Sequence, residues 1–145
     1  KMENLDAFRK AFEAVGTEVL TEEMLTPKVY YDAKIDIESV DDKTLKILEK
    51  MKPFGPSNMT PVFFSTQLND DGTGKIIGKT EEHIRLNIKR ENDSIAAVGF
   101  GLAPKITDIK KADSFEACFQ ISENIFRGNR SIQLMLKDIR PTNGA

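Results

Sequence analysis

The sequence is short of the residues that build several common kinds of active site. Its 145 residues include one cysteine and one histidine. One histidine does not supply the cluster of Asp and His that holds two metal ions in a hydrolytic site. The Asp41–Asp42 and Asp70–Asp71 pairs stand at an expected helix start and in an expected turn, where Asp serves the local backbone. No Gly-rich phosphate loop, Ser/His/Asp set or Cys/His metal spacing is present. Independent catalysis by this chain is therefore not expected.

Signals for secretion or membrane insertion are also missing. No apolar run approaches the roughly 20 residues that a membrane helix needs, and no charged-then-apolar signal segment opens the chain. The single Cys118 has no partner for an internal disulfide, and its place in the apolar run 115–121 favours a buried thiol. We therefore expect a cytoplasmic protein without a membrane partner. Because the chain begins at Lys1 and not at Met, we also expect a piece cut from a longer protein.

What is present is enough for one folded domain, because 39% of the residues are hydrophobic and nine are Phe. The net charge of -2 is spread unevenly. Residues 1–74 carry nine Lys/Arg against fourteen Asp/Glu, whereas residues 75–90 carry five against two and residues 125–140 carry four against one. Two basic stretches on an acidic background are suited to following a phosphate backbone. Ordinary solvated strand faces are the alternative.

The spacing of apolar residues changes along the chain from a helical period to a strand period. Asn4 is expected to cap a helix that ends at Gly16 and has one apolar face, made of Leu5, Phe8, Phe12 and Val15. A second helix is expected to begin after Asp41 and to end before Pro53. Extended runs are expected at residues 29–37, 62–68, 75–79, 84–89, 94–100, 114–121 and 131–139, with a turn at 69–74 and a short helix at 102–109.

The run at 75–79 resumes the strand of 62–68 after the turn, so beyond residue 61 the order is three strands, a helix and two strands. This order is that of an OB-fold, a five-stranded Greek-key barrel, whereas an SH3-like barrel usually lacks the helix and a sandwich has about seven strands. We therefore predict a mainly β chain with helices (α+β), in which a short helical segment precedes the barrel. Residues 1–28 are expected to form the helical segment, residues 29–141 the OB-fold domain and residues 142–145 a polar tail.

The proline-rich segment after the second helix carries a family resemblance. Residues 48–63 read LEKMKPFGPSNMTPVF, which resembles the L-x-P-F-G-x-G-N-x-x-P-x-F signature of the RecJ family of single-stranded-DNA-specific exonucleases. Later pieces also resemble the OB domain of that family, over about residues 29–141. They are residues 83–86 (HIRL), 99–101 (GFG), 124–128 (NIFRG), 133–134 (QL) and 138–139 (DI). Two departures, Ser57 in place of the usual Gly and Met59 in place of a frequent Pro, affect the conformation of the loop.

The resemblance implies a larger parent enzyme. Such a parent degrades single-stranded DNA from 5′ to 3′ with Mn²⁺ or Mg²⁺, in recombination and repair. It implies that residues 1–28 are the end of an upstream DHHA1-like domain, and that the metal ligands lie in an upstream Asp-His-His (DHH) core. No cofactor is expected in this chain, and the expected partners are single-stranded DNA and the missing DHH/DHHA1 core.

Two groups of residues are candidates for binding nucleic acid. If the strand at 84–89 turns its apolar side chains inward, one polar row shares the outer face, made of His83, Arg85, Asn87 and Lys89. A second group surrounds Gly128 in an expected loop at 123–130, made of Phe126, Arg127, Asn129 and Arg130. The alternatives are a solvated strand face for the first group and, for Phe126, a side chain turned inward to plug the barrel. Phe54 and Asn58 are interpreted as structural parts of the proline-rich loop.

Two hypotheses for function follow from these patterns. In the first, the chain is a single-stranded DNA-binding module that feeds strands to an absent catalytic core. In the second, it is a structural or protein-interaction domain that braces that core or docks a repair partner. The apolar face of the first helix and the acidic residues before position 75 favour the second hypothesis.

Overall fold

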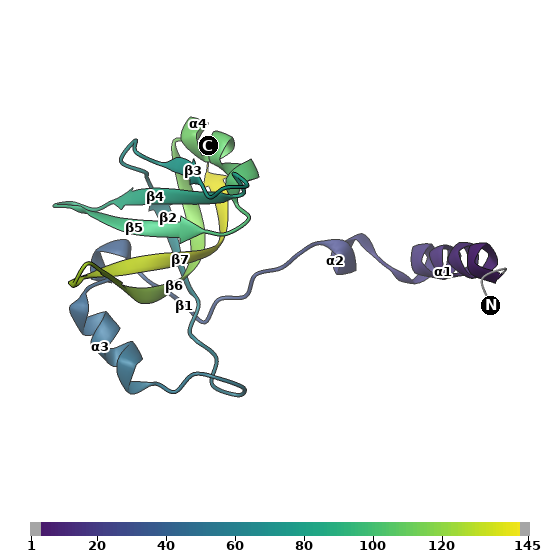
Figure 1. Ribbon diagram of the computed structural model, residues 1–145, viewed down its shortest axis with the longest axis horizontal. Coiled ribbons are helices and arrows are strands. Elements are labelled where there is room, and N and C mark those ends of the chain that lie inside the picture. The colour runs from purple at the N-terminus through teal and green to yellow at the C-terminus, as the bar shows by residue number, and fades with distance from the viewer. Residues whose placement is uncertain (1–3, 143–145) are drawn as a thin grey trace.

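The computed structural model describes residues 4–142. Figure 1 shows a body of curved strands and an N-terminal arm that carries α1 (Leu5–Val19) and α2 (Glu22–Leu25) away from it. The other helical elements belong to the body and are η2 (Ile37–Ser39), α3 (Asp42–Lys50), η3 (Ala103–Lys105) and α4 (Ile106–Lys111). Among residues 4–142, no helix is both long and apolar enough to cross a membrane. Residues 143–145 of the expected polar tail lie outside the described residues, as do residues 1–3.

In the described part of the chain, seven strands form one sheet in the order β1-β2-β6-β7-β5-β4-β3. Their bounds are β1 (Ala33–Lys34), β2 (Phe63–Leu68), β3 (Lys75–Ile77), β4 (His83–Lys89), β5 (Ser94–Gly99), β6 (Ser114–Phe126) and β7 (Asn129–Thr142). The chain between β2 and β3 stays bonded to β4, because the Asp71 N–H donates to the Asn87 carbonyl (2.8 Å) and the Lys89 N–H donates to the Asn69 carbonyl (2.8 Å). The sheet therefore curls around a single core, as expected for an OB-type domain.

The core lies inside this curve and follows from the alternation of side chains along each strand. On β4, Ile84, Leu86 and Ile88 are completely buried, whereas Arg85 and Lys89 are exposed. Helix α3 contributes two buried leucines, and α4 contributes two buried isoleucines. Each element thus presents one apolar face to the same interior.

The mixed α/β architecture agrees with the sequence prediction, but the strand count differs from the expected five. β1 is a two-residue strand parallel to β2, where a longer strand at 29–37 was expected. β2 and β3 are assigned as separate strands on either side of the turn at 69–74. β5 and β7 are parallel neighbours, which places strands far apart in sequence side by side.

The predicted start of α3 agrees with the structure, whereas the predicted end of α1 does not. For α3, the Asp41 carboxylate accepts the backbone N–H groups of Lys43 and Thr44, both at 2.9 Å, and the Thr44 N–H is the main cause that lowers the pKa of Asp41. For α1, Asn4 precedes the helix but its side chain makes no cap hydrogen bond. The expectation that Gly16 ends α1 is wrong, because Gly16 lacks the positive φ of a helix stop and the helix continues to Val19.

Candidate nucleic-acid interface

The strand β4 presents the predicted polar row on its outward side. Arg85 and Lys89 are exposed and His83 and Asn87 are half-buried, in alternation with the three buried isoleucine and leucine residues. The expectation that these four side chains share one face is therefore confirmed. The turn at 69–74 approaches the same side of the strand, so the row is partly occupied by contacts within the protein.

Those contacts separate the four residues into two kinds. His83 accepts the Gly101 N–H at Nδ1 (3.2 Å), and Asn87 donates from Nδ2 to the Thr73 hydroxyl (2.6 Å). Arg85 has no hydrogen-bond or ion-pair partner among residues 4–142. His83 and Asn87 are therefore held by the fold, while the Arg85 guanidinium faces solvent.

Lys89 has an acidic neighbour that the sequence pattern did not indicate. The Thr73 hydroxyl and the Thr73 N–H donate to Asp71, and these hydrogen bonds lower the pKa of Asp71, to which the charge of Lys89 adds a smaller effect. Asp71 is thus ionised at neutral pH beside one end of the polar row. Asp71 therefore balances part of the positive charge at the Lys89 end, while Arg85 and Lys75 lie side by side farther along the row.

The register of the sheet extends this outward face across four strands. Partners that pair directly across strands share a face, so two rows can be followed from β4 through β5 and β7 to β6. The first row is Arg85, Val98, Met135 and Gln120. The second row is Asn87, Ala96, Gln133 and Ser122. Neither row contains an acidic side chain, and the centre of the face consists of small or apolar groups.

The basic hairpin at 125–140 has a tighter structure than expected. The predicted loop at 123–130 is wrong, because β6 continues to Phe126 and β7 begins at Asn129. The turn consists of Arg127 and Gly128, whose φ angles are 50° and 79°. Two residues with positive φ form the mirror-image turn that suits the twist of a hairpin, and the sequence hid it because Asn or Asp usually precedes the Gly.

Phe126 lies at the exposed tip of this hairpin and does not plug the core. Its side chain is 63% exposed, and the Arg127 guanidinium carbon lies 5.2 Å from the centroid of its ring. Asn129 pairs with Phe126 across the hairpin, so both belong to the outward side of the sheet. Figure 1 shows the tips of the β4–β5 and β6–β7 hairpins at the same end of the body.

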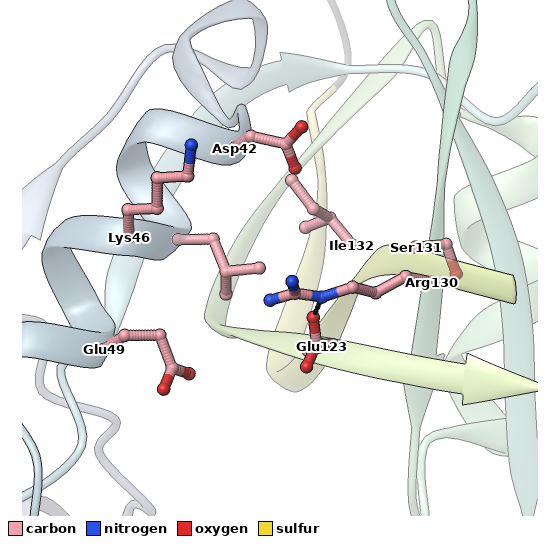
Figure 2. Close-up of a pocket in the computed structure, with 8 residues that line it drawn as sticks. Asp42, Lys46, Glu49, Glu123, Arg130, Ser131 and Ile132 are labelled. Atoms are coloured by element: carbon pink, nitrogen blue, oxygen red, sulfur yellow. Dashed lines mark ion pairs between the residues drawn. The ribbon is translucent and has the colours of Figure 1, made fainter. Parts of the chain in front are cut away.

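The Arg130 side chain lies on the opposite side of the hairpin from that of Asn129, because consecutive side chains of a strand alternate between its two sides. It pairs with Ile125 and forms an ion pair with Glu123, on the side of the hairpin that faces α3. Figure 2 shows the Arg130 guanidinium directed at Glu123 in a hollow of about 280 Å³ that α3 also lines. The expectation that Arg130 joins Phe126 and Arg127 on one binding surface therefore disagrees with the structure.

Sequence reasoning missed one exposed aromatic next to the polar row. Phe100 follows β5, is 61% exposed, and lies edge-on to the His83 ring with the ring centroids 5.0 Å apart. Its position between two glycines at a strand end, Gly99 and Gly101, was the available signal. The outward face thus has one exposed aromatic at each end, Phe100 and Phe126.

The acidic residues of the described chain do not gather into a metal site. Within residues 4–142 no group of three or more His, Cys, Asp or Glu side chains is placed to hold a metal ion. Asp41 accepts backbone N–H groups of its helix start, Asp71 accepts one of its turn, and Asp70 accepts those of its turn and of Asn87 in β4. The residues present therefore do not fit the Mn²⁺ or Mg²⁺ that the sequence resemblance implies for a parent enzyme.

Comparison with known proteins agrees with the fold and with the sequence resemblance. The chain is 24% identical over 139 residues to the single-stranded-DNA-specific exonuclease RecJ of Bacillus subtilis, covering 95% of this chain and 17% of that protein. It is 22% identical over 146 residues to the protein of the same name from Haemophilus influenzae, covering 96% of this chain and 24% of that protein. The chain thus spans about a fifth of the length of these relatives.

A solved structure matches over nearly the whole chain. The crystal structure of RecJ from Thermus thermophilus in complex with Mn²⁺ superposes with a TM-score of 0.72 at 16% identity, covering 99% of this chain and 20% of that one. The family model of the RecJ OB domain matches residues 31–138. This match covers well over half of the chain, including both candidate groups and most of the sheet. The chain therefore belongs to the RecJ OB domain family.

Proposed function

We propose that this chain is the single-stranded DNA-binding OB module of a RecJ-like 5′–3′ exonuclease that acts in recombination and repair. The observation that carries the proposal is the outward face of β4, β5, β7 and β6, whose two rows contain no acidic side chain. Lys75, Arg85 and Lys89 supply positive charge at one edge of this face. Such a face is suited to a negatively charged, extended strand.

The chemistry of the face assigns different parts of a strand to different residues. Phosphates are expected at Arg85 and Lys75, because an exposed cation that neutralises a phosphate releases the counterions condensed on the strand. Bases are expected over the small and apolar side chains of Val98 and Met135 and stacked on Phe126, where Arg127 adds a cation. His83 and Asn87 shape the edge of the face and do not lead binding, because both already have partners.

The catalytic steps belong, in this proposal, to other parts of a longer protein. The relatives are named as exonucleases and are four to six times as long as this chain, as the covered shares of 17% and 24% indicate. We place the Mn²⁺ or Mg²⁺ and its ligands in that remaining part, the DHH/DHHA1 core. The OB module then holds the strand so that its end enters the core.

Replacing Arg85 with alanine is expected to weaken single-stranded DNA binding several-fold and to reduce its salt dependence. Each phosphate that is no longer neutralised lowers the slope of log affinity against log salt by about 0.7 for a single strand. The measurement is fluorescence anisotropy of a labelled oligonucleotide over a salt series, with Arg127→Ala as a second variant. Lys110→Ala is the matched control, because Lys110 is an exposed cation of α4, away from the two rows.

Two results would contradict this proposal. The first is a wild-type chain that binds no single-stranded DNA even at low salt. The second is a loss of affinity with Lys110→Ala as large as that with Arg85→Ala, because binding would then depend on total charge and not on this face.

The N-terminal arm favours a second role, in which the chain braces the exonuclease core. Its helix α1 has a continuous apolar stripe with no cover from the body, made of Leu5, Phe8, Phe12, Val15 and Val19. Phe8 and Phe12 stack with their ring centroids 5.9 Å apart, and Phe12 is 69% exposed. Exposed apolar stripes of this kind mark interaction sites.

Replacing Phe12 with serine is expected to weaken association with the upstream part of the full-length protein by roughly tenfold or more, because burial of a Phe contributes about 1.5–3 kcal/mol. The two parts would be expressed separately and their dissociation constant measured by calorimetry. Glu13→Gln is the matched control on the polar face of α1. Equal affinity of the Phe12→Ser and wild-type chains would exclude this helix as the contact.

A further inference from the structure

A second aromatic surface lies at the β1–β2 edge of the sheet. Backbone hydrogen bonds hold residues 31–35 at this edge. The Asp32 N–H donates to the Val62 carbonyl (2.7 Å), and the Ile35 N–H donates to the Phe64 carbonyl (3.0 Å). The Asp32 carboxylate also accepts the Val62 N–H at 2.8 Å. Residues 31–35 are therefore held in one position against β2.

Tyr31 and Phe64 form a stacked pair on this surface. Their ring centroids are 4.9 Å apart, the ring planes differ by 20°, and the Lys34 Nζ lies 5.7 Å from the Phe64 centroid. Phe64 pairs with Cys118 on the outward side of β2, whereas its neighbour Phe63 packs against the core. Tyr31 remains 45% exposed, so the pair is a fixed aromatic platform with a face toward solvent and a cation at its side.

The platform forms one wall of a hollow of about 520 Å³, which Thr66, Glu116, Asp138 and Arg140 also line. The two carboxylates there have cationic partners, because Glu116 pairs with Arg140 and Asp138 pairs with Lys105. The acidic groups therefore do not repel a phosphate as free carboxylates would. An aromatic face, a nearby ammonium group and neutralised walls are the features that accept a nucleobase with its phosphate.

We propose that Tyr31 and Phe64 form a second base-stacking site, which binds an unpaired base of a long single strand already held at Arg85. This inference rests on the proposed function and extends it along the outward side of the sheet, from β4 to the opposite edge at β2. In the strand order, β5, β7 and β6 separate β4 from β2, so the path between the two sites spans about 19 Å at about 4.8 Å per strand. A strand of a few nucleotides reaches one site, and a longer one reaches both.

The dependence on strand length distinguishes base stacking from a purely structural role of the pair. Replacing Tyr31 with leucine is expected to weaken binding of an oligonucleotide of about 16 residues by roughly 5- to 100-fold, since one stacked base is worth about 1–3 kcal/mol. Binding of an oligonucleotide of about 3 residues, which is too short to span the path between the two sites, is expected to change less than twofold at the Arg85 face. Tyr31→Phe is expected to restore the long-strand affinity, because phenylalanine keeps the ring.

The adjacent tyrosine provides a matched control. Tyr30 is exposed and has no ring partner among the described residues, so Tyr30→Leu is expected to leave both affinities unchanged. A direct measurement uses the unmodified chain, a long oligonucleotide containing 5-iodouracil, ultraviolet light and mass spectrometry. Crosslinks are expected on Tyr31. This second measurement does not depend on how well the variants fold.

The outcomes separate this inference from the proposed function. If Arg85→Ala weakens binding while Tyr31→Leu has no effect on the long strand and no crosslink forms at Tyr31, the second site is excluded and the first stands. Equal losses for short and long strands would show that the pair only supports the fold. If the wild-type chain binds neither oligonucleotide at low salt, both proposals fall together.

Discussion

Replacing Phe119 with alanine is expected to lower the free energy of unfolding by about 3–5 kcal/mol, the usual range for a buried Phe. Phe119 is completely buried in the middle of β6, where it pairs with Phe63 of β2 on one side and with Leu136 of β7 on the other. Its ring centroid is 6.5 Å from that of Phe63. Because the side chain joins three strands at the centre of the sheet, its loss leaves a cavity that the curved strands cannot easily close. Urea unfolding followed by far-ultraviolet circular dichroism measures the change.

Phe126 is the matched control because it lies on the same strand at the solvent-exposed tip. Phe126→Ala is expected to change the free energy of unfolding by less than about 0.5 kcal/mol, as surface substitutions usually do. The same variant is expected to weaken DNA binding, whereas Phe119→Ala weakens it only as far as the chain unfolds. Equal stability of the Phe119→Ala and wild-type chains would contradict the assignment of the core.

Local patterns predicted those elements whose structure is decided locally. The strict alternation in residues 84–89 predicted β4 and its outward row, because only one register buries all three apolar side chains. Asp41 predicted the start of α3, because the cap bonds involve residues two and three positions later. Asn58 was interpreted as a structural part of the proline-rich loop, and its amide donates to the carbonyls of Met51 and Pro53.

The sequence could not predict features that depend on distant partners. β1 has two residues and exists because it pairs in parallel with β2, about thirty positions later, so no local period marks it. Asn87 was expected to face a ligand, but the hydroxyl of Thr73, in the turn between β2 and β3, accepts its hydrogen bond. Hydrogen bonds of this kind, between side chains far apart in the sequence, can be identified only from the three-dimensional structure.

The position of Arg130 shows how one turn decides a binding surface. If residues 123–130 formed a loop, as the sequence predicted, the direction of their side chains could not be derived from strand alternation. Once the turn is limited to Arg127 and Gly128, alternation begins again at Asn129 and turns Arg130 to the side of Glu123 and α3. Two arginines three positions apart therefore belong to different sides of the hairpin, and Arg127 alone extends the face that starts at Arg85.

Replacing Asp70 with alanine is expected to lower the free energy of unfolding by about 2–4 kcal/mol, because hydrogen bonds to a charged acceptor are worth more than neutral ones. The Asp70 carboxylate accepts three backbone N–H groups, from Gly72 (2.9 Å) and Gly74 (2.8 Å) in the turn and from Asn87 (2.9 Å) in β4. It thereby joins the turn that links β2 to β3 with the strand that carries the polar row. Urea unfolding measures the loss of stability.

The same substitution is expected to affect DNA binding through the position of β4. A built Cβ at Gly74 would lie 2.9 Å from an Asp70 carboxylate oxygen, so the turn fits closely around this side chain. Without Asp70 the turn is freed, and the Asn87 N–H loses its acceptor next to Lys89. Asp71→Ala is the control, because among residues 4–142 the Asp71 carboxylate bonds only within the turn, to Thr73, and a smaller loss of stability is expected. If Asp71→Ala destabilised the chain as much as Asp70→Ala, the stability would come from turn formation alone and not from the link to β4.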